Sequence, residues 1–115
     1  MPYNEKLADR TREIISLSNK NVEEKQMFGG LCFMVDDKMC VGVKADHIMV
    51  RIDPLLYEEA MEQEGCKPMI HGKKTMKAFL FVDEAVLNTK KKLEYWLNLA
   101  LEYNAVVKVS KKKQK

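Results

Sequence analysis

Three cysteines and two histidines are the side chains in this sequence best suited to holding a metal ion or acting as nucleophiles. A structural zinc ion takes about four such ligands in a tetrahedron. Cys32 and Cys40 fall on opposite faces of the hairpin predicted below, which argues against a shared ion or a disulfide between them. Cys66 lies beside Gly65 and Lys67, a setting in which thiols can react, although an inert thiol is the commoner case. We therefore predict no metal site and no cofactor.

The sequence also lacks the motifs of enzymes that use a serine nucleophile or bind nucleotide phosphates. No GxSxG is present, and the carboxylates fall mostly at turns, helix caps and helix surfaces. The run GKKT at residues 72–75 resembles the end of a phosphate-binding loop, but Lys67 stands where that loop needs its first glycine. We therefore predict that the protein is not an enzyme.

An anion-binding patch is the alternative to a purely non-enzymatic module. His47 and Arg51 share one face of a predicted strand, and the glycine pair Gly29 and Gly30 can expose backbone amides. Together these four residues could bind a small ligand or an anion, or serve a small enzyme. A solvated strand edge is the commoner explanation, so this neighbourhood stays the second hypothesis.

The net charge of +3 comes from the C-terminal end of the chain. Residues 111–115 hold four lysines, and without them 16 basic residues stand against 17 acidic ones. We predict that this lysine-rich tail is disordered, because it has no apolar residues to bury. The remaining body lacks the basic stripe of nucleic-acid-binding domains, which argues against direct nucleic-acid binding.

The protein is predicted to be cytoplasmic and not attached to a membrane. The N-terminal sequence MPYNEKLADR has neither the basic start nor the apolar stretch of a secretory signal. No apolar run approaches the ~20 residues of a transmembrane helix. Three cysteines, an odd number without a CxxC pair, fit a reducing compartment.

The length of 115 residues favours a single domain, which we place at residues 1–110. Its first element is an amphipathic helix from about Glu5 to Leu17, with apolar residues at a period near 3.6. These apolar positions are Tyr3, Leu7, Ile14, Ile15 and Leu17. The polar segment SNKNVEEKQ that follows is interpreted as a connector.

Three β-like runs follow each other between Met27 and Asp53. Asp36 with Asp37, and Ala45 with Asp46, predict two-residue turns between these runs. The pairs predicted across the first turn are Val35 with Lys38, Phe33 with Cys40 and Cys32 with Val41. Those predicted across the second turn are Val43 with Ile48 and Val41 with Val50.

This register gives the predicted sheet two different faces. The apolar face, expected to carry the helices, holds Phe28, Cys32, Met34, Met39, Val41, Val43, Ile48, Val50 and Ile52. The opposite, mixed face holds Met27, Leu31, Phe33, Val35, Lys38, Cys40, Lys44, His47, Met49 and Arg51. Its apolar centre predicts a cover, either another segment of the chain or a second copy in a homodimer. The candidate binding or interface residues are Leu31, Phe33, His47, Met49 and Arg51.

The second half of the chain predicts two more helices and a strand. Asp53 and Pro54 start a helix over residues 55–64, which ends at Gly65 and buries Leu56, Tyr57, Ala60 and Met61. Pro68 keeps the next segment from being helical, and residues 76–82 form a strand. Asp83 caps a short turn, and Asn88 or Thr89 starts a long helix with its apolar stripe at Leu93, Trp96, Leu97, Ala100, Leu101 and Tyr103. Residues 105–109 either extend this helix or form a terminal strand.

Four blocks in this order carry a family resemblance. They are MFGG at residues 27–30, VRIDP at 50–54, MKAFLFVD at 76–83 and LEYWLNLALEYN at 93–104. In this arrangement the chain resembles the N-terminal domain of the TfoX/Sxy family. The resemblance implies an α+β two-layer sandwich, with a mainly antiparallel β-sheet meander and helices packed on one face, similar to secretion chaperones. It also implies a regulatory or adaptor module that acts by contact with a protein partner of unknown identity.

The namesakes of this family are competence regulators that promote transcription together with a cyclic-AMP receptor protein. They carry a further C-terminal domain, and we expect the present chain to be a stand-alone N-terminal domain. The motif Met27, Phe28, Gly29 and Gly30 is interpreted chiefly as a structural bend, because adjacent glycines permit a positive φ or a close backbone approach. The alternative is that the glycine amides form a binding ledge.

Overall fold

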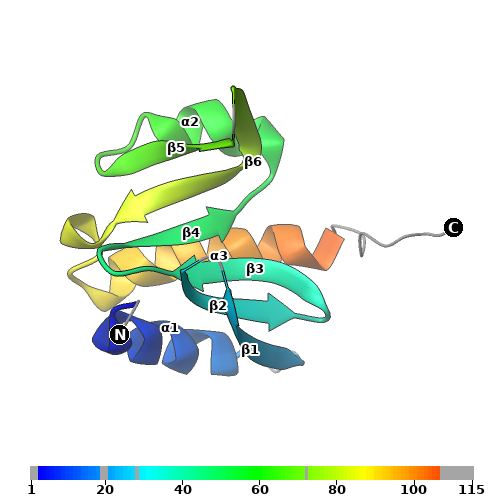
Figure 1. Cartoon of the computed structure of the whole chain (residues 1–115), viewed down its shortest axis with the longest axis vertical. Helices are drawn as coiled ribbons and strands as arrows, with labels where there is room; N and C mark the ends of the chain where they lie inside the picture. Colours follow the sequence, from blue (N-terminus) through cyan, green and yellow to red (C-terminus); the bar gives the residue numbers. More distant parts are fainter. Residues whose placement is uncertain (1–2, 19–20, 28, 72, 107–115) are drawn as a thin grey trace, which may run out of the picture.

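The structure is a computed structural model that describes residues 3–18, 21–27, 29–71 and 73–106. Within these residues the chain forms one antiparallel sheet of six strands, ordered β1-β2-β3-β4-β6-β5, and three α-helices. In chain order the elements are α1 (Glu5–Ser16), β1 (Val22–Met27), β2 (Gly30–Val35), β3 (Lys38–Val43), β4 (His47–Arg51), the 3₁₀ turn η1 (Pro54–Leu56), α2 (Tyr57–Met61), β5 (Cys66–His71), β6 (Lys74–Asp83), the 3₁₀ turn η2 (Glu84–Val86) and α3 (Lys90–Val106). The sheet is one layer and the helices are the other, with α3 behind β3 and β4 in Figure 1. The predicted α+β two-layer fold is confirmed.

Helix α1 begins where the sequence predicts it. The Asn4 side chain caps it by accepting a hydrogen bond from the Leu7 backbone N–H at 3.0 Å. Leu7, Ile14 and Ile15 are buried as expected. Leu17 was placed on the same apolar stripe, and this is wrong, because the helix ends at Ser16 and 69% of Leu17 is exposed.

The interpretation of the segment after α1 as a connector is also wrong, since it contains β1. Val22 pairs with Val35 and Met27 pairs with Gly30, so β1 lies along β2 at one edge of the sheet. Residues 23–26 are all exposed. An edge strand with exposed, charged positions shows no apolar alternation, and the sequence pattern therefore gave no sign of it.

Within the MFGG motif, Met27 ends β1 and Gly30 begins β2. Gly29 has a φ of +72°, a conformation that favours glycine. Gly30 is buried, and a Cβ added there would lie 2.4 Å from the backbone oxygen of Val43. These two observations support the structural interpretation of the glycine pair. Phe28 lies outside the described residues.

The first hairpin has the predicted turn but a different register. Asp36 and Asp37 both have positive φ, at 52° and 65°, and Val35 pairs with Lys38 as expected. Met34 then pairs with Met39, whereas Phe33 pairs with Val41, so Cys40 is an extra residue in β3. The predicted pairs Phe33 with Cys40 and Cys32 with Val41 are therefore wrong, because a β-bulge shifts the register by one residue.

Because of this shift, each side chain of β2 lies on the opposite face of the sheet from the one predicted. A one-residue slip moves every side chain of a strand to the other face. Leu31, Phe33 and Val35 consequently lie in the core beneath the helices, while Cys32, Met34 and Met39 lie on the other side. Lys38 also lies on the helix side, where its ammonium donates to the backbone oxygen of Asn104 at 2.7 Å. Cys40 is buried within the core cluster.

The second hairpin is confirmed as predicted. Val43 pairs with Ile48 and Val41 pairs with Val50, and the Lys44 N–H donates to the His47 oxygen at 2.8 Å. The core cluster accordingly keeps the part of the predicted apolar face contributed by β3, β4 and the residue after β4, namely Val41, Val43, Ile48, Val50 and Ile52.

The predicted helix after Asp53 is shorter than expected. Asp53 does cap it, accepting from the Leu55 N–H at 2.9 Å, but a 3₁₀ turn precedes α2, which ends at Met61. Tyr57 and Ala60 are buried and Met61 is half-buried, whereas 38% of Leu56 is exposed and its predicted burial is wrong. The segment around Pro68 is non-helical, as predicted, and forms the edge strand β5.

The C-terminal elements follow the prediction closely. Strand β6 includes the predicted residues 76–82, and Asp83 caps η2 by accepting from the Ala85 N–H at 3.0 Å. Thr89 precedes α3, and its hydroxyl accepts from the Lys92 N–H at 3.2 Å. The apolar stripe of α3 packs on the sheet, and only 4% of Trp96 is exposed.

Ala105 and Val106 continue α3, which answers part of the question about residues 105–109. Residues 107–115, and with them the predicted disordered tail at 111–115, lie outside the described residues. Among the helices of the described part of the chain, none is both long and apolar enough to cross a membrane.

Candidate functional site

The five predicted interface residues divide between the two faces of the sheet. Leu31 and Phe33 are only 5% and 0% exposed and belong to the helix-covered core, so their assignment to the mixed face opposite the helices was wrong. His47, Met49 and Arg51 alternate with the core residues of β4 and share the other face. The structure therefore brings three of the five together.

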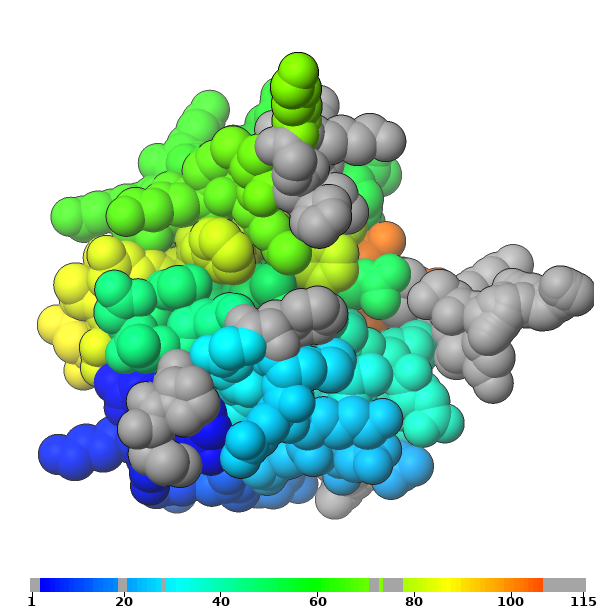
Figure 2. Space-filling view, in the orientation of Figure 1, coloured from blue at the N-terminus to red at the C-terminus, as the bar shows by residue number. Residues whose placement is uncertain are grey.

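We call this second side of the sheet the open face, because all three described α-helices pack into the core on the opposite side. The strand register assigns to it Glu23, Lys25, Met27, Cys32, Met34, Met39, Gly42, Lys44, His47, Met49, Arg51, Lys67, Phe79, Phe81 and Asp83. Figure 2 views the molecule from this side, where side chains of β2 to β4, in cyan to green, gather on the surface.

The centre of the open face is apolar and closely packed. Met49 and Cys32 are each 2% exposed, and both lie against Gly42, where an added Cβ would meet the Met49 Cε at 3.3 Å and the Cys32 Sγ at 3.7 Å. The glycine thus leaves room for the Met49 side chain to lie flat across β3. Around this centre, Met34, Met39, Phe79 and Phe81 are half-buried.

His47 is held in place by two neighbours. Its Nδ1 lies 2.7 Å from the Asp46 Oδ1, and this hydrogen bond lowers the pKa of the Asp46 carboxyl. Its ring meets the Phe81 ring edge-on, with centroids 4.7 Å apart. A hollow of about 220 Å³ lies beside them and is lined by Asp46, His47, Lys67, Phe81 and Asp83. Because the hollow has charges of both signs, it is not a simple anion site.

Arg51 lies at the far end of β4 from His47. Its guanidinium carbon is 5.5 Å from the centroid of the Phe79 ring, which is cation–π geometry. Its Nε is buried and has no hydrogen-bond partner within the described residues. It lies four positions after His47 along the strand, roughly 13 Å away at about 3.3 Å per residue.

The anion-binding hypothesis needed Gly29, Gly30, His47 and Arg51 to converge. Gly30 lies beside the side chain of Lys44, which is hydrogen-bonded through its backbone to His47, so these residues share one end of the sheet. Arg51 is at the other end of β4, and Gly30 is packed against β3 instead of forming an exposed ledge. The four residues therefore do not form one site.

Cys32 and Cys40 are buried thiols, and Cys66 is half-buried. Burial raises the pKa of Cys66 to about 11 and that of Cys40 to about 12, and it also raises the pKa of Cys32. At neutral pH all three are protonated and poor nucleophiles, Cys66 included. Within the described residues, no three His, Cys, Asp or Glu side chains are grouped so that they could hold a metal ion.

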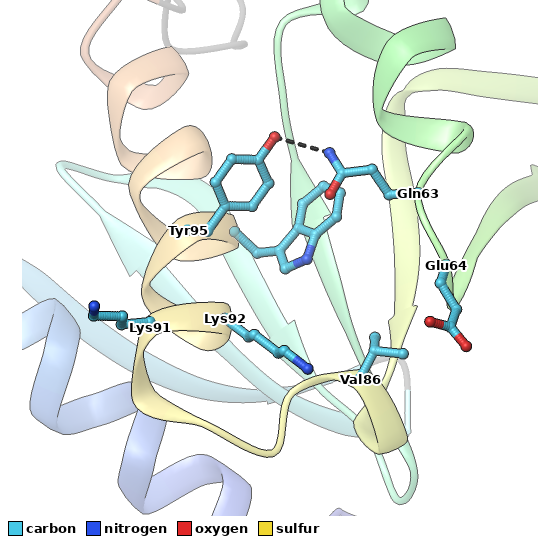
Figure 3. Close-up of a pocket in the computed structure, with 7 residues that line it drawn as sticks. Gln63, Glu64, Val86, Lys91, Lys92 and Tyr95 are labelled. Atoms are coloured by element: carbon cyan, nitrogen blue, oxygen red, sulfur yellow. Dashed lines mark hydrogen bonds between the residues drawn. The ribbon is translucent and has the colours of Figure 1, made fainter.

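A cavity in the helix layer was not anticipated from the sequence. It measures about 350 Å³ and is lined by Gln63, Glu64, Val86, Lys91, Lys92, Tyr95 and Trp96 (Figure 3). The Gln63 amide donates to the Tyr95 hydroxyl at 2.8 Å and so ties the segment after α2 to α3. Trp96 was predicted only as a core residue. No local pattern could reveal the cavity, because its walls are up to 33 residues apart in the chain.

The architecture defines a small two-layer α+β domain with one sheet face that none of the described helices covers. The chain belongs to the TfoX N-terminal domain family, whose model matches residues 16–103. Among solved structures it is similar to a protein from Pseudomonas syringae, with a TM-score of 0.58 and 14% identity over 82% of this chain and 97% of that one. This similarity concerns the fold. No curated protein matches the chain.

Proposed function

We propose that this chain is a non-enzymatic, regulatory adaptor module that binds an acidic, amphipathic segment of a protein partner on its open face. The observation that carries the proposal is the apolar centre of that face, formed by the half-buried Met34, Met39, Phe79 and Phe81 around Met49. Methionine side chains adapt to different partner surfaces, and phenylalanine adds a large contact area. A protein segment with apolar side chains suits this composition better than a small polar ligand does.

The charges around this centre indicate the sign of the charge on the partner's binding segment. Lys25 on β1 and Lys67 on β5 lie at the two edges of the sheet, and Lys44 and Arg51 lie between them. The strand register places the carboxylates of Glu23 and Asp83 on the open face, and Asp46, hydrogen-bonded to His47, lies beside Lys67 and Asp83 at one edge of it. An acidic segment across the strands would meet cations at both edges of the apolar centre.

A second copy of the chain is a poorer occupant by the same argument. Two open faces placed against each other would bring like charges of Lys25, Lys44, Arg51 and Lys67 into one interface, which costs free energy. The family supports a regulatory setting for the module, because its namesakes act on transcription together with a protein partner. We therefore favour a different protein as the partner over the homodimer that the sequence also suggested.

Site-specific photo-crosslinking in the native host tests the proposal. A benzophenone amino acid at Met34 or Met39 is expected to capture a discrete protein through an acidic peptide, which mass spectrometry can identify. The matched control is the same amino acid at Glu13, an exposed position on α1. Capture from Glu13 but not from the open face, or capture of the chain itself or of nucleic acid, would overturn the proposal.

A charge-reversal pair then checks the electrostatic part. Lys25→Glu with Lys67→Glu should weaken binding of the captured partner by about tenfold or more, because two attractions become repulsions. The control pair, Lys6→Glu with Lys90→Glu, makes the same change at exposed helix positions and should leave the affinity unchanged. Equal effects of the two pairs would show that only net charge matters and that the open face is not the site.

A further inference from the structure

We infer that the cavity between the end of α2 and the start of α3 binds a small organic monoanion with a flat apolar body, such as an aromatic carboxylate. The cavity lies in the helix layer and shares no lining residue with the open face, so this site is independent of the proposed protein contact. Its volume of about 350 Å³ matches a small ligand.

Two aromatic side chains give the cavity its apolar part. Trp96 is 4% exposed, and Tyr95 is 45% exposed. The two rings meet edge-on, with centroids 5.1 Å apart and planes at 79°. The hydrogen bond from Gln63 restrains the Tyr95 ring, and Val86 forms part of the facing wall. A flat ring placed in this corner would contact apolar surface on both sides.

Lysine side chains give the cavity its charge. Lys92 extends from the first turn of α3 toward Val86, whereas Lys91 extends away from the other labelled side chains (Figure 3). Lys92 takes part in none of the ion pairs found among the described residues. Its ammonium is therefore available to a carboxylate, and the positive end of the α3 dipole adds to the attraction.

Glu64 on the opposite wall limits the ligand to a single negative charge. It belongs to the segment between α2 and β5 and lines the same cavity as the lysines. A second anionic group would meet this carboxylate and be repelled. The expected ligand is therefore an aromatic monocarboxylate and not a dicarboxylate or a nucleotide.

The intrinsic fluorescence of Trp96 provides a direct test, because it is the only tryptophan of the chain. The probes are 3-phenylpropionate and its neutral isostere 3-phenylpropionamide, added to the full-length protein. The acid should cause a saturable change in fluorescence and bind about tenfold more tightly than the amide, owing to the attraction of Lys92. No saturation by the acid up to about 10 mM, or equal binding of both compounds, would overturn the inference.

Three variants separate a built site from general attraction to a basic surface. Lys92→Met should weaken binding of the acid about fivefold or more. Lys90→Met, on the same helix turn but outside the cavity lining, should leave this affinity unchanged. Glu64→Gln should strengthen binding of the acid about two- to threefold, because it removes the opposing charge. Equal effects of the two lysine changes, or weaker binding in Glu64→Gln, would contradict the site as described.

Discussion

The two faces of the sheet are built from the same strands but from different kinds of side chain. On the covered face, Val41, Val43, Ile48 and Val50 are completely buried, and branched aliphatic residues predominate. On the open face, methionine, phenylalanine and charged residues alternate with them, and several are half-exposed. Neighbouring residues of one strand therefore have different roles. The covered face holds the fold together, and the open face is the surface on which we propose that a protein partner binds.

The largest expected difference between the two faces comes from the same substitution, Phe→Ala, made once on each face. Phe33→Ala, on the covered face, should lower the free energy of unfolding by about 3–5 kcal/mol, because it opens a cavity in a fully packed core. Phe81→Ala, on the open face, should lower it by about 1 kcal/mol, since that side chain is half-exposed. Urea denaturation measures both.

If Phe33→Ala does not fold, the matched pair Phe33→Leu and Phe81→Leu replaces it, with expected losses of about 1–1.5 kcal/mol at Phe33 and less than about 0.5 kcal/mol at Phe81. Equal losses for the substitutions at Phe33 and Phe81 would contradict the assignment of the two faces.

A second comparison uses two buried glycines. Gly30→Ala should destabilise the protein by about 2–3 kcal/mol, because the new Cβ would clash with the backbone oxygen of Val43 at 2.4 Å. Gly42→Ala should cost less than about 1 kcal/mol, since it meets the end of the flexible Met49 side chain. Thermal or urea unfolding of both variants checks this order, and a reversed order would exclude the close approach of β2 and β3 at Gly30.

The smallest effect concerns the rim of the covered face, where Arg12 of α1 binds Glu24 of β1 through two hydrogen bonds of 2.6 and 2.8 Å. These bonds lower the pKa of Glu24. Arg12→Met should therefore reduce stability at pH 7 by about 0.5–1 kcal/mol, a value that allows for solvent screening of exposed groups.

The stabilisation by the Arg12–Glu24 pair should decrease as the pH falls. A carboxyl whose pKa is lowered in the folded state stabilises the protein above its unfolded pKa of about 4.3 and loses this contribution as the pH falls through the folded value. The difference between Arg12→Met and the unaltered protein should shrink below about pH 4. The exposed Lys6→Met is the control, and a difference that persists at pH 3 would show that Arg12 acts by packing and not by charge.

Much of the fold could be predicted wherever a local signal exists. Asn4 before α1, Asp53 before η1 and Asp83 before η2 cap their elements, because a short polar side chain can satisfy the free N–H groups of the first turn. The two tight turns could be predicted equally well from the sequence. Strands β1 and β5 were missed, since an exposed edge strand and a strand containing Pro68 both lack the alternation that marks a half-buried strand.

The candidate site was only half predictable. His47, Met49 and Arg51 were placed together correctly, because the turn at Ala45 and Asp46 sets their strand in simple register. Phe79 and Phe81, which complete the open face, are visible as an alternating pair, but only the pairing of β4 with β6 sets them beside Met49 and Arg51. The cavity at Trp96 required the folded chain as well.

The sequence alone determined the starts of α1 and α3, the two β-turns and the apolar stripe of α3, because each depends on residues close in the chain. Only the tertiary structure decided which side of β2 faces the helices. A single extra residue at Cys40 reverses that strand, and its presence depends on how β3 pairs with two neighbours at once. Alternation along a strand shows that two faces exist, but the partner strands and the helix layer select which one is buried.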